Sequence, residues 1–246
     1  GLFTKEIEEA LLDGRIDLAV HSLKDLPTEL PEGLTVASIP QREDARDALV
    51  GATLDGLAVG ARVGTSSLRR AAQLRALRPD LAILDVRGNV DTRLRKQQEG
   101  QYDALVMASA GLTRLGLAAH IAAYLDPAEF LPAVAQGALA IETRDDGGAA
   151  WAACQAIQDL RATAEVSAER ALLAGLGGGC QVPLGAHAIA HGSRLELRAV
   201  VVSPDGKRII RKQAAGAIED AARLGEEVAR QFLASEARAI IEAAES

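Results

Sequence analysis

The segment RVGTSSLRRAAQLRAL, residues 62–77, determines the expected fold class. Its first three residues suit a short buried strand, and the apolar positions from Ser66 to Leu77 recur at helical spacing. Two further pairs of the same kind follow, with a strand at 81–86 and a helix at 90–99, then a strand at 102–108 and a short helix ending near Gly116. Strands that alternate with helices at this spacing predict a parallel, doubly wound α/β sheet.

The chain before this region has its own strand signals. An apolar stripe within residues 2–12 predicts a helix with Thr4 as its N-cap, and residues 17–22 and 34–39 suit buried strands. The charged stretch 40–46 is a candidate crossing into another domain. A later strand at 138–143 and a helix at 149–160 are expected to return the chain to the first domain.

The pattern changes beyond residue 160. A helix at 164–176 is followed by alternating segments at 184–190, 195–203 and 208–214, and then by a helix at 218–244 that is interrupted near Ser235. Such an order predicts a small α+β domain. The expected division is therefore a first domain formed by 1–40 and 138–158, a second domain at 45–132 and a third domain at 162–246.

Composition restricts the class of function. The 246 residues exceed one ordinary core and suit two or three domains of roughly 100 residues each. A net charge of −7 makes the chain as a whole repel nucleic acids and anionic membranes, so any anion site must be local. No apolar run reaches the roughly 20 residues of a membrane span. The absence of a signal segment and of a disulfide framework makes a reducing cytoplasm the expected location.

Two strand ends carry motifs suited to anions. Thr65, Ser66 and Ser67 open the helix that also carries Arg69 and Arg70, where the helix dipole and free backbone N–H groups favour negative charge. Simple capping by a serine is the alternative, although capping needs no pair of arginines. The end of the next strand holds Arg87, Gly88 and Arg93, with Gly88 allowing a tight turn and close ligand approach. Two such sites in tandem predict a ligand with several carboxylates or phosphates.

Other reactive side chains have several interpretations. Lys24 and Asp25 follow a strand and could form a catalytic pair, an exposed ion pair or a capping carboxylate. His21 is expected to be a structural histidine on a buried strand. Cys180 follows three glycines, so its thiol could be accessible for covalent chemistry, whereas Cys154 lies on an apolar helix face and is expected in the core.

Seven segments together resemble the porphobilinogen deaminase family, also called hydroxymethylbilane synthases. The resemblance spans essentially the whole chain in family order, through residues 1–6, 21–27, 64–70, 87–94, 110–116, 131–138 and 178–183. It implies two lobes similar to periplasmic binding proteins, plus a small α+β domain that carries the cofactor. It also implies a transferase of tetrapyrrole biosynthesis, which joins four porphobilinogen molecules head to tail and releases ammonia at each coupling.

The resemblance also implies residue roles. Cys180 would hold a dipyrromethane cofactor through a thioether, and Asp25 would stabilise cationic pyrroles and shuttle protons. The acetate and propionate groups of the pyrroles would be bound by Arg69, Arg70, Arg87, Arg93 and Arg114, together with Ser22, Lys24, Thr65, Ser66 and Ser67. The implied partner is the small molecule porphobilinogen, with neither nucleic acid nor membrane, and a monomer is expected.

Two departures from the family pattern lead to further expectations. Family members carry roughly another 60 residues before the Gly-Leu-Phe segment at 1–3, a length needed for a first strand and helix. Without them the first lobe would expose a sheet edge, so we expect the chain alone to be unstable and weakly active. Ala135 stands where many members have Gly, and its methyl is expected to change little. The competing interpretations are a two-lobed polycarboxylate-binding module and an inactive copy.

Overall fold

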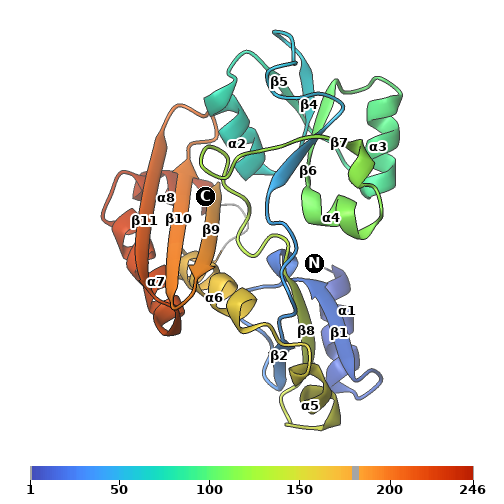
Figure 1. Ribbon diagram of the computed structural model, residues 1–246, viewed down its shortest axis with the longest axis vertical. Coiled ribbons are helices and arrows are strands. Elements are labelled where there is room, and N and C mark those ends of the chain that lie inside the picture. The colour runs from blue at the N-terminus through green and yellow to red at the C-terminus, as the bar shows by residue number, and fades with distance from the viewer. Residues whose placement is uncertain (1, 179–182, 246) are drawn as a thin grey trace.

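The computed structural model describes residues 2–178 and 183–245, and these residues form three separate sheets with their own helices (Figure 1). We call them the first, second and third units, in the order in which the chain enters them. The first unit is a sheet of order β1–β8–β2, in which β8 is antiparallel to both neighbours. Its elements are α1 (Leu2–Leu12), β1 (Leu18–Ser22), the 3-10 turn η1 (Leu23–Asp25), β2 (Leu34–Ser38), β8 (Leu139–Arg144) and α5 (Ala149–Gln155).

The second unit is a five-stranded sheet of order β5–β4–β6–β3–β7. Strand β4 is parallel to β5 and β6, whereas β3 is antiparallel to β6 and β7. Its elements are β3 (Asp47–Val50), β4 (Arg62–Gly64), α2 (Leu68–Leu77), β5 (Ala82–Leu84), α3 (Val90–Gln98), β6 (Ala104–Ala108), α4 (Ser109–Arg114), the 3-10 turn η2 (Ala118–His120) and β7 (Ile121–Tyr124).

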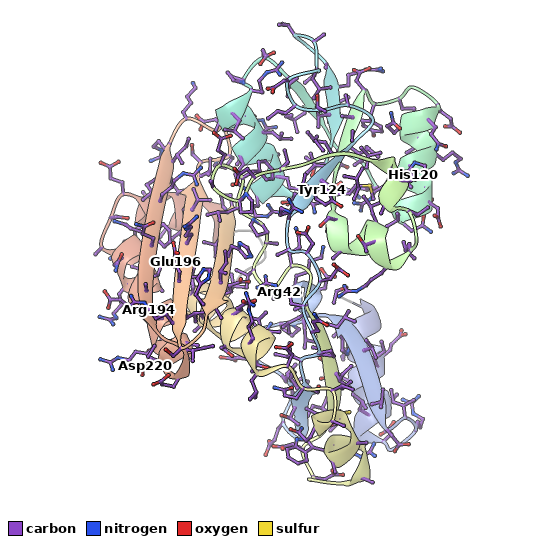
Figure 2. The ribbon with its side chains drawn as sticks, in the orientation of Figure 1. Arg42, His120, Tyr124, Arg194, Glu196 and Asp220 are labelled. Atoms are coloured by element: carbon purple, nitrogen blue, oxygen red, sulfur yellow. The ribbon has the colours of Figure 1, made fainter. Side chains whose placement is uncertain are left out.

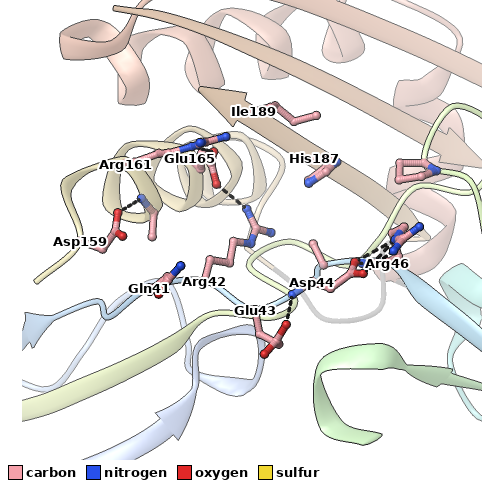
Figure 3. A pocket seen from close by; sticks show the side chains of 13 residues that line it. Gln41, Arg42, Glu43, Asp44, Arg46, Asp159, Arg161, Glu165, His187 and Ile189 are labelled. Carbon is pink, nitrogen blue, oxygen red and sulfur yellow. Dashed lines mark hydrogen bonds and ion pairs between the residues drawn. The ribbon is translucent and has the colours of Figure 1, made fainter. Parts of the chain in front are cut away.

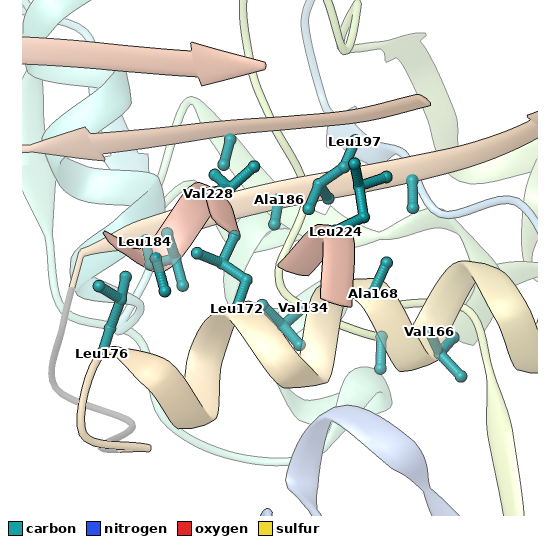
Figure 4. Packing of buried hydrophobic residues seen from close by; sticks show 14 of the residues in the cluster. Val134, Val166, Ala168, Leu172, Leu176, Leu184, Ala186, Leu197, Leu224 and Val228 are labelled. Carbon is teal, nitrogen blue, oxygen red and sulfur yellow. The ribbon is translucent and has the colours of Figure 1, made fainter. Parts of the chain in front are cut away.

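The third unit is an antiparallel meander of order β11–β10–β9. Helices pack on one face of this sheet, where Leu172 and Val228 contact the apolar side chains of β9 and β10 (Figure 4). Its elements are α6 (Leu160–Gly175), β9 (Leu184–His191), β10 (Arg194–Val202), β11 (Ile209–Ala217), the 3-10 turn η3 (Ile218–Asp220), α7 (Ala221–Leu233) and α8 (Ala237–Glu245). The α+β character predicted for the end of the chain is confirmed.

The α/β class is confirmed, but the sheets are mixed where the sequence pattern predicts parallel strands. Among the strands of the described residues, only β5, β4 and β6 form parallel pairs, and β3 and β7 were not expected as strands. Strand β3 comes directly from a crossing segment and therefore enters the sheet in the opposite direction to β6. Such long-range pairing leaves no trace in local periodicity. The N-cap expected at Thr4 is also wrong, because α1 already begins at Leu2.

Two crossing segments, residues 39–46 and 125–138, connect the first and second units (Figure 1). They meet where the Glu43 backbone N–H donates to the Gly137 carbonyl at 3.2 Å. Gly137 has φ +87°, and a Cβ there would clash with the Glu43 carbonyl, so only glycine suits this position. The same segments also contact the third unit, since Val134 packs with Leu172 in the largest apolar cluster.

Candidate active site

Asp25 lies on a short turn that is anchored on both sides. Strand β1 continues its ladder as Leu23 donates its N–H to the Ala138 carbonyl at 3.0 Å, and the Leu26 N–H then closes the turn onto the Leu23 carbonyl at 3.2 Å. Leu23 and Leu26 are buried at 1% and 5% exposure, whereas Asp25 is exposed. The backbone of Asp25 is thus held by packing while its carboxylate remains accessible.

Lys24 brings the first unit into electrostatic contact with the second. The pKa of Lys24 is lowered to about 8, first by burial and then by the guanidinium of Arg70, while the carboxylates of Asp25 and Asp47 act in the opposite direction. Arg70 lies on α2 and Asp47 on β3, so these groups come from separate units. The two units therefore bring the charges of Lys24 and Arg70, both predicted to bind ligand, within electrostatic range of each other at their junction.

The hydroxyls at the start of α2 already have partners within the protein. Ser67 is the N-cap, and its hydroxyl accepts from the Arg70 N–H at 3.4 Å. Ser66 donates its hydroxyl to the Val86 carbonyl at 2.5 Å, and the Thr65 hydroxyl accepts from the Ser67 N–H at 3.2 Å. Capping therefore accounts for Ser67, and the other two hydroxyls fix the turn that ends β4.

Arg69 and Arg70 share a counter-ion that the sequence did not single out. Asp47 is fully buried and accepts from Arg69 Nη1 at 2.7 Å and from Arg70 Nε at 2.8 Å. Burial alone would raise the pKa of Asp47. The two guanidinium groups and a hydrogen bond from Gln136 lower it instead, to about 2. Only 6% of Arg69 and 8% of Arg70 is exposed. Both guanidinium groups are therefore packed inside the second unit and held by Asp47, unlike arginine side chains that extend into solvent.

The second arginine motif divides between the junction and the surface. Gly88 has φ +119°, and its carbonyl accepts from Arg93 Nε at 2.7 Å. Burial and the charge of Arg70 lower the pKa of Arg93, which places Arg93 near α2. Arg87 is exposed and pairs with Asp85 at 3.0 Å. Arg114, at the end of α4, donates to the Gly137 carbonyl at 2.7 Å and so reaches the crossing segments.

The predicted cofactor-attachment residue Cys180 lies outside the described residues. Its neighbour Gly178 is described, and a Cβ on Gly178 would lie 3.0 Å from the Thr28 hydroxyl. The segment leading to Cys180 therefore starts beside the segment that follows Asp25. Ser22, also predicted to bind ligand, is exposed at the end of β1.

Two structural predictions are confirmed. Cys154 is buried at 4% exposure, in a cluster with Ala37 and Ile141. His21 has its Nε2 atom 2.8 Å from Oε2 of the buried Glu142, as expected for a structural histidine. The expectation of a buried strand is wrong, because β1 lies at the edge of its sheet and leaves Leu18 and Val20 45% and 58% exposed.

A polar cavity of about 390 Å³ lies apart from Asp25, where the first crossing segment meets α6 and β9 (Figure 3). Arg42 reaches into this junction between the units, as Figure 2 shows, and pairs with both carboxylate oxygens of Glu169 at 2.8 and 3.0 Å. Glu169 also accepts from the Ala135 and Ala188 N–H groups. Sequence reasoning identified the charged stretch as a crossing but not this clamp, whose partner is 127 residues away.

Among residues 2–178 and 183–245, no helix has both the length and the apolar character needed to cross a bilayer. Within the same residues, His, Cys, Asp and Glu side chains form no cluster of three that could hold a metal ion.

Comparison with known proteins gives consistent matches along the chain. The family model for the dipyrromethane cofactor binding domain of porphobilinogen deaminase matches residues 1–151, and the model for its C-terminal domain matches residues 163–234. Porphobilinogen deaminase of Nitratidesulfovibrio vulgaris Hildenborough is 55% identical over 98% of this chain and 78% of its own length. The enzymes of Syntrophobacter fumaroxidans and Thermus thermophilus are each 50% identical over 98% of this chain, covering 79% and 81% of their own lengths.

Solved structures align less closely. The methionine binding protein MetQ has a TM-score of 0.41 at 17% identity, covering 62% of this chain and 74% of its own. A Salmonella typhimurium periplasmic binding protein with high arginine specificity has a TM-score of 0.36 at 14% identity, covering 63% of this chain and 70% of its own. The family models and the curated relatives decide the matter: this chain belongs to the porphobilinogen deaminase family.

Proposed function

We propose that this chain joins four porphobilinogen molecules head to tail, with release of one ammonia at each coupling, and that water then cleaves the tetrapyrrole from the enzyme as linear hydroxymethylbilane. The observation that carries the proposal is the junction where the charge of Lys24, next to Asp25 on the turn, interacts with that of Arg70 from another unit. Ligands with several carboxylates would meet cations here, next to a carboxylate able to work on a cationic pyrrole.

Asp25 is the proposed catalytic residue. Its carboxylate is exposed on an anchored turn, so it can approach substrate without rearrangement of the backbone. A carboxylate in this place stabilises a positively charged pyrrole and can accept and return a proton at each coupling. Because the turn is held by packing of Leu23 and Leu26, the same geometry serves each of the four couplings.

The proposed binding residues fall into two groups. Arg70 lowers the pKa of both Lys24 and Arg93, so the three cations together are the proposed cationic part of the junction. The remaining proposed contacts surround it at the ends of β1, β4, β5 and α4, and they are Ser22, Thr65, Ser66, Ser67, Arg69, Arg87, Gly88 and Arg114. Asp47 neutralises part of the charge of Arg69 and Arg70, so Lys24 and Arg93 supply much of the remaining attraction for an anion.

The residues present suit the family's dipyrromethane group. Its acidic side chains would meet Lys24 and Arg93, and its thioether would form at Cys180, whose segment starts beside Thr28. When bound, the group supplies the free pyrrole carbon from which the chain of substrate units grows. Lys24 and Arg93 would orient this group, and Asp25 would handle protons next to it.

We also propose the domain division 1–40 with 138–158, 45–132, and 162–246, because each part has its own sheet. The chain is proposed to act as a monomer in the cytoplasm, with porphobilinogen as its small-molecule partner and without nucleic acid or membrane. Its net charge of −7 supports the last two points.

Intact mass of the purified chain tests the proposal. We expect an added mass equal to two linked pyrrole units, which Cys180→Ser loses and Asp25→Asn retains. Asp25→Asn should also abolish turnover of porphobilinogen while leaving the fold unchanged. An unmodified parent chain would contradict the attachment, and equal turnover by Asp25→Asn and the parent would contradict the role of Asp25. Binding of a polycarboxylate without turnover in the parent would favour the binding-module interpretation.

A further inference from the structure

Arg170 of α6 holds the backbone on both sides of Asp25. Its Nη2 donates to the Pro27 carbonyl at 2.6 Å, and its Nη1 donates to the Leu26 carbonyl at 3.1 Å and more weakly to the Leu23 carbonyl at 3.5 Å. These carbonyls belong to the turn that carries Asp25 and to the residues immediately after it. One side chain from the third unit thus contacts the turn of the first unit at three points.

The guanidinium of Arg170 has an unusual environment. It is half-buried, and burial lowers its pKa without a carboxylate acting in the opposite direction. Within the part of the chain that the structure describes, no ion pair joins Arg170 to an acidic side chain. Carbonyl oxygens alone compensate the partial loss of water around this cation. A lysine has three donors on a single nitrogen, so it lacks the fixed fork by which two nitrogens of Arg170 reach the Leu26 and Pro27 carbonyls.

The position of Arg170 also connects two parts of the site. Helix α6 ends at Gly175, and the chain then passes Gly178 beside Thr28 on its way to Cys180. Arg170 therefore fixes the Asp25 turn against the same helix that leads to the cofactor-attachment segment.

We propose that Arg170 is a positioning residue that orients the Asp25 turn relative to helix α6. This inference rests on the proposed function, in which Asp25 is catalytic. Apolar packing of Leu23 and Leu26 already attaches the turn to the core, so removal of Arg170 leaves the fold intact. What is lost is the direction of the turn, because hydrogen bonds are directional and apolar contacts are not. A misplacement of about 1 Å can reduce turnover by about 100-fold.

The experiment compares Arg170→Ala with Arg161→Ala, a control on the same helix whose side chain is 64% exposed and contacts Glu165. Hydrogen–deuterium exchange followed by mass spectrometry reports on residues 23–28. We expect exchange at least about tenfold faster there in Arg170→Ala, with β6 unchanged and the control like the parent. Turnover of Arg170→Ala should fall about 100-fold with KM changed less than kcat, and millimolar guanidinium should restore part of it.

Arg170→Lys provides a second variant that keeps the charge but not the fork, and it should resemble Arg170→Ala in exchange and in kcat. Unchanged exchange at residues 23–28 in both variants would overturn the inference, as would parental kcat. A parent chain that makes no hydroxymethylbilane would instead count against the proposed function, and the exchange data would still decide whether Arg170 holds the turn.

Discussion

Replacement of Asp47 by Asn is expected to lower the free energy of unfolding by about 3–5 kcal/mol at pH 7, because a buried pair would lose one charged partner. Asp47 is fully buried and is the shared counter-ion of Arg69 and Arg70, at 2.7 and 2.8 Å. In the variant, two guanidinium groups would stay buried beside a neutral amide. The desolvation of these groups, more than the lost hydrogen bonds, sets the size of the effect.

The pH dependence gives a second magnitude. The pKa of Asp47 falls from 3.8 to about 2 on folding, which corresponds to about 2 kcal/mol of stability. Because the folded pKa is the lower one, this contribution is complete above about pH 5 and is lost as the pH falls towards 2. About half of it is lost at pH 3, so the difference between the parent and Asp47→Asn should narrow by about 1 kcal/mol there.

Urea unfolding followed by circular dichroism at pH 7 and pH 3 measures both quantities. The matched control is Asp103→Asn, since Arg62 also lowers the pKa of Asp103 to about 2, but this pair is exposed. Solvent screens an exposed pair, so the control should change stability far less, and about 1 M salt should remove the change. The reasoning would be refuted if the two substitutions lowered the free energy of unfolding equally. It would also be refuted if the difference in this free energy between the parent and Asp47→Asn were as large at pH 3 as at pH 7.

Two further predictions concern Ala135 and Lys24. Ala135→Gly should change the free energy of unfolding by less than about 1 kcal/mol. Glycine removes the strain of an alanine in the left-handed region at φ 59°, and this gain offsets the loss of a buried methyl group and the greater flexibility of glycine in the unfolded chain. Ala168→Gly within α6 should cost about 2 kcal/mol in the same urea unfolding assay, and equal losses at the two sites would contradict this account. Since the pKa of Lys24 is about 8, its charge declines as the pH rises above 8, so KM for porphobilinogen should rise between pH 7 and pH 9. Lys24→Arg should keep a nearly constant KM over that range, and parallel pH profiles of the two proteins would show that Lys24 does not bind the substrate.

Local patterns in the sequence predicted much of the structure. The strand and helix that open the quoted segment are β4 and α2, and the predicted strands at 34–39 and 184–190 are β2 and β9 within two residues at each end. The buried Cys154 also follows from nearby residues, and simple capping by a serine, the alternative to an anion site, accounts for Ser67. These features depend on side-chain periodicity and on hydrogen bonds spanning a few residues, which the sequence displays directly.

The residue types of the candidate site were likewise predictable, but their partners were not. The sequence placed Arg69 and Arg70 at a helix start with hydroxyls around them, and it resembled one enzyme family over its whole length. It did not show that Asp47, more than 20 residues earlier, is their common counter-ion. Nor did it show that Arg170 lies against the Asp25 turn, 144 residues from the Leu26 carbonyl it binds.

The sequence by itself therefore determined the α/β class, most element positions, the family and the candidate residues. Only the tertiary structure decided the mixed order of the sheets, the clamp between Arg42 and Glu169, and which charges neutralise one another. The physical reason is that periodicity and capping act over one or two turns of chain. Strand order and burial of charge depend instead on segments that the two crossings bring together from distant parts of the sequence.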